Sequence, residues 1–340
     1  MRCTVLSAEK TTNIYDRELQ ELGVTQAVLL KGENVSAIFR ILKTFRRYKE
    51  YIRANPCDII YLNLTNAVTM RYAKIAAEEG IKKRIVHSHA SGIQPGKSYV
   101  IKKIAHNISK KFFIKYVTEC WTCSEQAALF LFDPCSKKEI ESIPNAIEIE
   151  KFRFDIEKRK IMRNKLGIEN EDVKIIGNVG RLTAEKNQIF LLKVFAKVHQ
   201  KNPNTKLLLI GDGPLRNMLE QYAKEIGIFE SCFFYGFTED TAPFYSAIDL
   251  FCLPSIVEGF GIVALEAQAA GCPCLLSNNV SEQIKATSDC DVKFLPLEQE
   301  VWEIELIEQL EKTTRNRVDV HIDSQYDIGT AAVFTQGKFF

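Results

Sequence analysis

The sequence predicts an α/β protein made of two doubly wound domains, each with a parallel sheet covered by helices. Three observations support this prediction. The 340 residues are about twice the length of a typical domain. Short apolar runs alternate with longer segments of helical periodicity along most of the chain. Several of these runs end in glycine-rich loops, as strands do where an α/β sheet binds a ligand.

We place the boundary between the two domains after residue 155. Residues 1–155 carry an excess of basic side chains, and residues 156–340, which end in a helical tail, carry an excess of acidic ones. Such an asymmetry suggests that the two halves face different partners.

The composition excludes several classes of protein. Hydrophobic residues make up 46% and charged residues 26% of the chain, which is typical of a globular protein and not of a disordered or fibrous one. A net charge of +2 gives no reason to expect nucleic acid as a partner. No apolar run reaches the ~18 residues of a membrane span. The first ten residues lack the apolar core of a signal peptide, so we expect a cytoplasmic location.

Ten cysteines are the one unusual feature of the composition. Only Cys120/Cys123 and Cys272/Cys274 are close pairs, and there is no second Cys-x2-Cys to complete a zinc site. We therefore expect reduced cysteines that act as small apolar residues.

The first half alternates strands and helices. Its predicted strands are Cys3–Leu6, Ala27–Leu30, Ile59–Leu62, Arg84–His87 and Glu119–Cys123, and its clearest helices are Val35–Arg53 and Ala67–Glu79. Ser124 is placed as the N-cap of a further helix. Ile143-Pro144-Asn145 is predicted to end a strand and to lead into a linker near Glu148–Arg159.

The second half alternates more regularly, as a doubly wound domain does. Its predicted strands are Val173–Val179, Thr205–Ile210, Cys232–Tyr235, Leu250–Leu253 and Pro273–Leu276. Its predicted helices are Asn187–Gln200, Leu215–Ile226, Ala242–Ala247 and Ile262–Ala270.

The most informative motif opens the last of these helices. It runs Glu258-Gly259-Phe260-Gly261-Ile262 and continues to Glu266. Two glycines let the backbone approach a ligand closely, and a helix N-terminus favours an anion such as a pyrophosphate. Glu258 and Glu266 are too far apart along the helix to form one acid–base pair. They are placed to accept hydrogen bonds from two different parts of an extended ligand, such as the hydroxyls of sugars. The alternative is a surface loop whose Glu258 only favours the helix dipole.

A second motif follows the strand Val173–Val179. Gly180-Arg181 is followed by Lys186 in the loop before a helix. Because carboxyl ends of parallel strands share one edge, these cations are expected on the same edge as Glu258. Two cations there would neutralise a diphosphate and stabilise it as a leaving group. Gly211 and Gly236 end the next two strands and are weaker candidates, since glycine also serves plain turns. Solvated loop charge is the alternative for Arg181 and Lys186.

His87-Ser88-His89 ends a strand of the first half, where an imidazole can donate to a substrate oxygen. A buried structural histidine is the alternative. Asp289-Cys290-Asp291 has the spacing of a metal-binding pair but lies away from the shared edge, so no metal is expected. The chain also lacks the glycine fingerprints of dinucleotide dehydrogenases and of P-loop kinases.

A basic amphipathic segment covers Ile101–Val117. Residues 80–118 contain no acidic residue, and apolar and basic side chains alternate there with helical spacing. Such a helix can lie weakly on an anionic membrane surface. The alternative is a core-packed helix with a solvated lysine face.

These motifs together resemble the retaining glycosyltransferases of family 4, which have the two-domain GT-B architecture with two Rossmann-like domains facing across a cleft. The resemblance covers nearly all of residues 173–296. In the first half it rests on Val86-His87-Ser88-His89, Cys123-Ser124 and Ile143-Pro144-Asn145, and at the end on Tyr326-Asp327-Ile328. This combination is similar to the branch that builds capsular polysaccharides and exopolysaccharides.

The resemblance implies a role for each site residue. The second domain would bind a nucleotide sugar, most often a UDP-sugar. Arg181 and Lys186 would hold the diphosphate, Glu258 the sugar hydroxyls and Glu266 the ribose. The residues counted as donor-binding are Gly180, Arg181, Lys186, Gly211, Gly236, Glu258, Gly259, Phe260, Gly261, Ile262 and Glu266. His89, or less favourably His87, would reach the sugar from the first domain, so the catalytic set is Glu258, His89, Arg181 and Lys186. The family needs no metal or other cofactor.

The sequence departs from the family at its start. Family members begin with a strand and a Gly-Gly-rich loop, whereas Arg2-Cys3-Thr4-Val5-Leu6 resembles the second strand. We therefore expect the first domain to lack its first βα unit, which places activity in question. Asn145-Ala146 replaces the usual Asn-Gly.

The function predicted is transfer of a sugar, with retention, from a UDP donor to a lipid-linked or polysaccharide acceptor, in the cytoplasm or at the inner face of the cell membrane. Two alternatives stay open. One is a GT-B sugar-nucleotide epimerase or hydrolase, which would need no acceptor. The other is a non-catalytic partner subunit. Donor sugar, acceptor, linkage and oligomeric state are not specified by the sequence.

Overall fold

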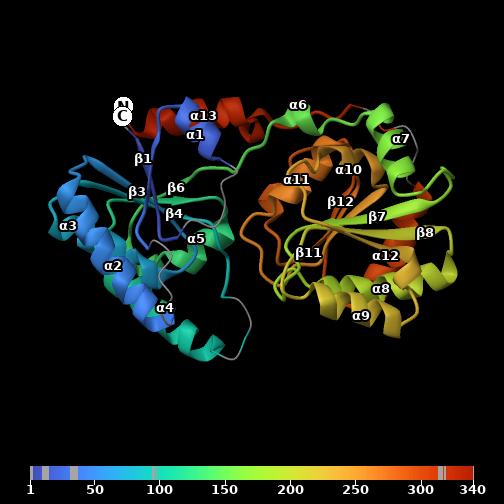
Figure 1. Cartoon of the computed structure of the whole chain (residues 1–340), viewed down its shortest axis with the longest axis horizontal. Coiled ribbons are helices and arrows are strands. Elements are labelled where there is room, and N and C mark those ends of the chain that lie inside the picture. Colours follow the sequence, from blue (N-terminus) through green and yellow to red (C-terminus); the bar gives the residue numbers. More distant parts are fainter. Residues whose placement is uncertain are drawn as a thin grey trace. The chain divides into compact units, whose positions relative to one another are not determined.

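The computed structural model has an α/β fold built on parallel sheets (Figure 1). It describes residues 3–9, 15–30, 37–93, 96, 98–312, 317 and 319–339. Outside these residues lie Arg2, Lys97 and residues 35–36, where the first predicted helix begins.

Contacts divide the chain into two compact units. The first comprises Met1–His87, Ile104–Trp121 and Phe132–Ile140, and the second comprises Ser88–Lys103, Thr122–Leu131 and Glu141–Phe340. Segments 88–103, 122–131 and 141–155 thus make most of their contacts with residues of the second unit, although they precede the boundary at residue 155. The boundary itself, the facing of two domains across a cleft and the lack of a first βα unit stay predictions.

The strands of the early part of the chain form two sheets. In the smaller one, β1 (Thr4–Ser7) pairs in parallel with β2 (Thr25–Val28). The other sheet has the order β3-β4-β5-β6, with bounds Ile59–Leu64, Lys83–Ser88, Glu119–Thr122 and Ile140–Ser142. The accompanying helices are α1 (Asp16–Glu21), α2 (Ala37–Ala54), α3 (Arg71–Glu78), α4 (Tyr99–Phe113) and α5 (Glu125–Leu131).

A small apolar core fixes α2 and α3 in the first unit. Phe45, Tyr48 and Ile52, spaced along one face of α2, are buried together with Ile75 of α3. This spacing is what brings a helix to pack through one face. The predicted helices of this region are confirmed, apart from the masked start of α2.

The second unit contains a six-stranded parallel sheet with the order β12-β11-β10-β7-β8-β9. Its strands are Lys174–Val179 (β7), Thr205–Ile210 (β8), Cys232–Gly236 (β9), Leu250–Leu253 (β10), Cys274–Ser277 (β11) and Val292–Leu295 (β12). In this doubly wound order β7 and β10 are neighbours, and the chain runs outward from them in opposite directions. The point between β7 and β10 is therefore the topological switch point.

Both faces of this sheet are covered by helices (Figure 1). Strand β8 illustrates this burial on both faces: Leu207 and Leu209 pack into one apolar cluster, while Leu208 and Ile210 pack into the other. The helices that follow β6 in the chain are α6 (Ile149–Phe152), α7 (Ile156–Lys165), α8 (Gln188–Lys201), α9 (Arg216–Glu225), α10 (Ala242–Ala247), α11 (Ile262–Ala269), α12 (Gln299–Lys312) and α13 (Ile328–Phe339), of which α13 has no buried residue.

The predicted linker near Glu148–Arg159 is wrong, because these residues contain α6 and the start of α7. Ile149 and Phe152 of α6 are buried, which a solvated linker does not require. Asp155 caps α7 by accepting hydrogen bonds from the amides of Glu157 and Lys158. An aspartate just before a helical pattern was the signal that the sequence interpretation overlooked.

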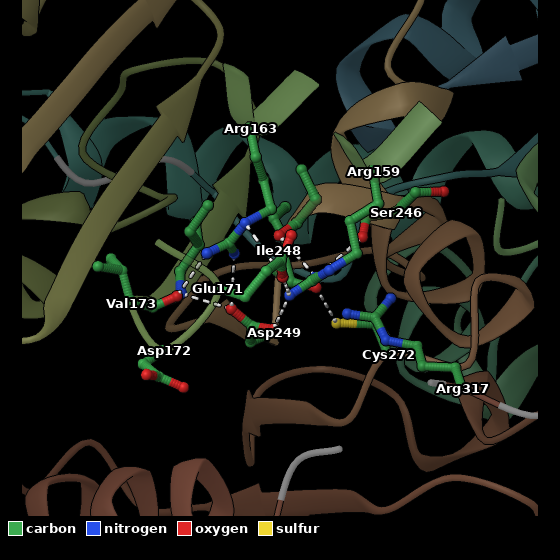
Figure 2. A network of polar contacts seen from close by, with 12 residues as sticks. Arg159, Arg163, Glu171, Asp172, Val173, Ser246, Ile248, Asp249, Cys272 and Arg317 are labelled. Carbon is green, nitrogen blue, oxygen red and sulfur yellow. Dashed lines mark hydrogen bonds and ion pairs between the residues drawn. The ribbon is translucent and has the colours of Figure 1, made fainter. Parts of the chain in front are cut away.

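Helix α7 is joined to the sheet by buried ion pairs (Figure 2). The guanidinium groups of Arg159 and Arg163 lie 2.8 and 3.4 Å from the two carboxylate oxygens of Asp249, and all three residues are at most 2% exposed. Asp249 Oδ2 also accepts a hydrogen bond from the amide of Ile175, at the start of β7. Glu171, which is 36% exposed, adds a second carboxylate. The network therefore lies at the amino ends of β7 and β10, away from their carboxyl ends.

Replacement of Asp249 by asparagine is expected to destabilise the protein by about 3–5 kcal/mol, because two buried guanidinium groups lose their buried counter-ion and keep only the partly exposed Glu171. Circular dichroism in increasing urea measures the loss. Glu171→Gln is the matched control, since its partly exposed side chain should change the unfolding free energy by less than about 1 kcal/mol. Equal effects of the two substitutions would contradict the role given to Asp249.

All ten cysteines are free thiols, and Cys252, Cys272 and Cys274 are buried in the core of the second unit. Burial raises the pKa of the Cys272 thiol to about 11, so it stays protonated and unreactive. Within the described residues, none of the helices is long and apolar enough to cross a bilayer.

Candidate functional site

The candidate site lies where the two central strands of the second unit end. Gly180 directly follows β7, and Pro254 directly follows the neighbouring strand β10. Since ligands of doubly wound sheets bind beyond the carboxyl ends of the strands at the switch point, both predicted motifs are on the expected edge.

The loops after β7 and β10 are joined by hydrogen bonds. The buried amide of Asn178 donates to the carbonyl of Cys252 at 2.8 Å, and the backbone amide of Ile256 donates to the carbonyl of Glu185 at 2.7 Å. At the start of α8, Gln188 Nε2 donates to the carbonyl of Arg181 at 3.1 Å. Of these contacts, the one between Ile256 and Glu185 joins the two loops directly, and the one between Asn178 and Cys252 joins the ends of the two strands.

An ion pair links the two predicted motifs. Lys186 Nζ donates to Glu258 Oε2 at 2.6 Å, and the hydroxyl of Ser255 donates to the same oxygen at 3.0 Å. The side chains of Lys186 and Glu258 are 21% and 11% exposed, so both are largely shielded but still reachable. The pair gives Lys186 an internal counter-ion that an incoming anion can replace.

Arg181 lies on the same loop, but its side chain is exposed. Within the described part of the chain, that side chain forms no ion pair. Its guanidinium is thus available to an anion without first giving up a partner.

The glycine turns after β7, β8 and β9 pack backbone against backbone. Gly211 donates its amide to the carbonyl of Gly236 at 2.8 Å. Gly211 also has φ +129°, and a Cβ built there would lie 2.1 Å from the carbonyl oxygen of Gly180. Gly236 has φ +91°. Glycine is needed at Gly211 for this close approach, so Gly180, Gly211 and Gly236 form one connected turn region at the strand ends.

The Glu258–Ile262 loop leads into the N-terminus of α11. Gly261 is the N-cap with φ +92°, a conformation that favours glycine. A Cβ at Gly259 would lie 2.1 Å from the carbonyl oxygen of His89, so only glycine fits there. The Phe260 side chain is buried in the hydrophobic core, whereas Ile262 is 39% exposed. Phe260 therefore anchors the loop, Gly261 is buried beside it, and Ile262 is exposed.

Glu266, the second glutamate of the motif, lies in a partly buried position on α11. The hydroxyl of Tyr245 donates to Glu266 Oε2 at 2.6 Å. Burial raises the pKa of the Glu266 carboxyl above its usual 4.5, although hydrogen bonds from Tyr245 and Thr241 and the charge of Lys151 oppose the shift. The two glutamates therefore have different partners: Glu258 pairs with Lys186, and Glu266 accepts from the hydroxyl of Tyr245.

The two candidate histidines have different surroundings. The carbonyl of His89 faces Gly259, and burial lowers the pKa of the His89 imidazole, which favours its neutral form. His87 belongs to the first unit, is 3% exposed and forms an aromatic cluster with Tyr61 and Trp121. Its Nδ1 lies 2.5 Å from the Tyr61 hydroxyl. Of the two, His89 is the one placed against the Glu258 loop.

Four polar residues of this region are absent from the predicted site: Ser91, Ser124, Tyr245 and Ser255. Ser255 lies in the loop just after β10 and could have been noted from its position alone. Ser124 was predicted only as an N-cap, which is confirmed, because its hydroxyl accepts from the amide of Ala127 at 3.2 Å. Ser91 and Tyr245 carry no signal in a single sequence.

The Asp289-Cys290-Asp291 segment forms a hydrogen bond with another part of the chain. Asp289 Oδ2 accepts a hydrogen bond from the amide of His321 at 2.8 Å. Across the residues that the structure describes, no group of three or more potential metal ligands is close enough to hold an ion. That the protein works without a metal stays a prediction.

Comparisons with known proteins show what the second unit is similar to. The family described as "Glycosyl transferases group 1" matches residues 158–311. The "Putative glycosyltransferase EpsF" of Bacillus subtilis (strain 168) is 30% identical over 244 residues, which are 71% of this chain and 63% of that protein. The "UDP-Gal:alpha-D-GlcNAc-diphosphoundecaprenol alpha-1,3-galactosyltransferase" of Escherichia coli is 32% identical over 143 residues, which are 41% of this chain and 37% of that enzyme. The chain thus spans less than two thirds of either relative.

Solved structures agree on the fold. Anabaena Alr3699/HepE in complex with UDP and glucose matches with a TM-score of 0.75 and 17% identity, over 99% of this chain and 91% of that one. The predicted fold class is confirmed: the chain has the α/β fold of GT-B glycosyltransferases, and its residues 158–311 match the group 1 glycosyltransferase family.

Proposed function

We propose that this protein is a retaining glycosyltransferase that moves a sugar from a UDP donor to a lipid-linked or polysaccharide acceptor during capsule or exopolysaccharide synthesis. The observation that carries the proposal is the Lys186–Glu258 pair at the β7–β10 switch point, next to the N-terminus of α11. A cation and a helix N-terminus favour a diphosphate, while a carboxylate favours sugar hydroxyls. UDP is proposed as the nucleotide because HepE is known in complex with UDP and the E. coli relative is named for UDP-Gal.

In this proposal each residue has one role in binding the donor. Lys186 and Arg181 bind the diphosphate, the turn glycines and the backbone at Gly261 and Ile262 let it approach, and Glu258 exchanges its lysine for the sugar hydroxyls. Glu266 accepts from the ribose.

The reaction breaks the bond between the anomeric carbon and the β-phosphate oxygen. The electron pair leaves with UDP, whose developing charge the two cations stabilise. The acceptor hydroxyl forms its new bond to the anomeric carbon on the same face, and its proton passes to the departing phosphate oxygen. We propose that His89, kept neutral by burial, binds the donor sugar by its imidazole. No step requires a metal.

Product analysis tests the proposed function directly. The protein is incubated with UDP-glucose or UDP-galactose, with and without a diphosphoundecaprenol-linked saccharide, and products are identified by mass spectrometry and anomeric NMR. A transferase extends the acceptor with retained configuration. Release of free or altered sugar in the absence of acceptor would favour the epimerase or hydrolase. If calorimetry detects no binding of UDP, the non-catalytic subunit is favoured.

Donor affinity should depend on the protonation of Glu266. The ionised carboxylate can accept from both ribose hydroxyls, whereas the protonated form loses one acceptor. Because burial raises its pKa, UDP affinity is expected to weaken on acidification at a pH above the usual 4.5. The folded protein also binds this proton more tightly than the unfolded chain does, so the stability contributed by the group falls as the pH rises through the raised pKa.

Calorimetry of UDP binding between pH 5 and 8 measures this effect. Glu266→Gln should weaken binding about tenfold at pH 8 and remove this acidic decline, while titration of the UDP phosphate affects both proteins alike. Tyr245→Phe removes a hydrogen bond to the carboxylate and should move the decline to higher pH. Identical pH profiles for the wild type and Glu266→Gln would contradict the ribose role.

We propose that α4 brings the protein to the cytoplasmic membrane surface. Five large apolar side chains of this helix are more than half exposed: Val100, Ile101, Ile104, Ile108 and Phe112. Lysines such as Lys102, Lys103 and Lys111 interleave with them. Apolar insertion and attraction to anionic lipid act together on such a helix.

Co-sedimentation with phosphatidylglycerol vesicles checks this contact. Wild-type binding is expected to be weak and to decrease with salt. The combined substitution of Ile104, Ile108 and Phe112 by serine should lower it about tenfold or more. Ile304→Ser, at an equally exposed position on α12, is the control and should have no effect. Binding that the triple variant retains in full would contradict the proposal.

A further inference from the structure

We infer that Ser91 and Ser124 are positioning residues that hold the Glu258–Gly259 backbone in the orientation that the donor site needs. The Ser91 hydroxyl donates to the carbonyl of Glu258 at 2.5 Å. The Ser124 hydroxyl donates to the next carbonyl, that of Gly259, at 2.6 Å. All four residues belong to the second unit. The inference rests on the proposed function for its consequence in catalysis.

Two hydrogen bonds occupy the hydroxyl of Ser124. Ser124 is 0% exposed, and its oxygen accepts the amide of Ala127 as the N-cap of α5. A hydroxyl has a single proton, so that proton is committed to the carbonyl of Gly259. A buried polar group that loses such a partner costs the full desolvation of that group, which fixes this contact in place.

One further contact restricts the same loop, and a second restrains the chain next to Ser124. The carbonyl of His89 faces Gly259 so closely that no Cβ fits between them. Next to Ser124, the amide of Glu125 donates to Gln283 Oε1 at 2.9 Å. The loop is therefore held by hydroxyls at two successive carbonyls and by close packing between them.

The consequence for the site follows from the geometry of the peptide bond. In a trans peptide the carbonyl and the N–H point in opposite directions. With the carbonyls of Glu258 and Gly259 turned toward the serines, the amides of Gly259 and Phe260 point the other way. The same restraint fixes the start of the Glu258 side chain, which reaches Lys186 and Ser255.

Ser91 gives the cleaner test, because Ser124 also caps a helix. Hydrogen exchange of the free protein, read on peptides covering residues 256–264, reports the restraint without any substrate. Ser91→Ala is expected to speed hydrogen exchange in these peptides about fivefold to tenfold, and Ser91→Thr is expected to restore the slow rate. Ser142→Ala, at an exposed serine of β6, is the control and should leave the exchange unchanged. Unchanged exchange in Ser91→Ala would overturn the inference.

The functional consequence is measured with the donor that the wild type uses best among UDP-glucose and UDP-galactose. Ser91→Ala should lower kcat about tenfold, with the melting temperature unchanged and the Kd for UDP within twofold. Ser124→Ala should do the same with some loss of stability, and Ser124→Thr should recover activity. In a Glu258→Gln background, Ser91→Ala should change the Kd of the UDP-sugar less than twofold, because its effect passes through Glu258.

These outcomes separate the inference from the proposed function. A wild type that transfers sugar while Ser91→Ala keeps full kcat overturns the positioning role and leaves the transferase standing. A wild type that transfers no sugar from either donor counts against the proposed function. In that case altered exchange in Ser91→Ala still supports the restraint on the loop.

Discussion

Replacement of Glu258 by glutamine is expected to lower sugar transfer about 10²- to 10³-fold while the Kd for UDP stays within about threefold. Glutamine keeps the shape of the side chain but loses the charge and one of the two acceptor oxygens that hold the sugar. UDP binding should persist, because Lys186, 2.6 Å from Glu258 in the free protein, becomes available to the phosphates.

Steady-state transfer assays and calorimetry with UDP measure the two effects. Glu282→Gln is the control, since this exposed glutamate lies outside the Glu258 loop and should leave both quantities unchanged. Undiminished turnover of Glu258→Gln would remove Glu258 from the catalytic set. A loss of UDP binding as large as the loss of turnover would show that Glu258 acts on the nucleotide instead of the sugar.

The second large effect is expected for Gly259→Ala. The new Cβ would lie 2.1 Å from the carbonyl oxygen of His89, and neither partner is a flexible side-chain end that could rotate away. The loop must therefore shift by about 1 Å, and a displacement of that size in a catalytic site can cost about 100-fold in rate. We expect a comparable loss of kcat, accompanied by faster hydrogen exchange at residues 256–264.

Gly337→Ala separates this effect from the general cost of adding a methyl group. A Cβ at Gly337, in the exposed helix α13, meets no atom within 4 Å. Alanine there should keep full activity and slightly raise stability. A fully active Gly259→Ala would contradict the close packing of Gly259 on His89.

Much of the second unit could be predicted from the sequence. Strands β8 and β10 and helix α10 have the predicted bounds, because each is a short buried run between clear turn residues. Strand β12 and helices α7 and α12 were not predicted. In α12 the charged residues interrupt the apolar periodicity, although Trp302 and Leu306 are buried, so tertiary packing decides where a local pattern is weak.

The candidate site shows the same division. Residues in the loops that follow strands, such as Gly180 and Glu258, could be placed because parallel strands bring their carboxyl ends to one edge. The direct ion pair between Lys186 and Glu258, 72 positions apart, could not, since a spacing in sequence does not fix the distance between two side chains. Nor could Phe260 be recognised as a core residue, or Ser91 and Tyr245 as partners of the loop and of Glu266.

The central claim is that the β7–β10 switch point binds the diphosphate of a nucleotide sugar. A crystal structure of the protein with UDP tests it most directly. The account predicts the β-phosphate within hydrogen-bond distance of Lys186 Nζ and of the backbone at Gly261 and Ile262, with the ribose hydroxyls on Glu266. UDP bound at another place in the chain, or phosphates that lie away from Lys186 and α11, would contradict it.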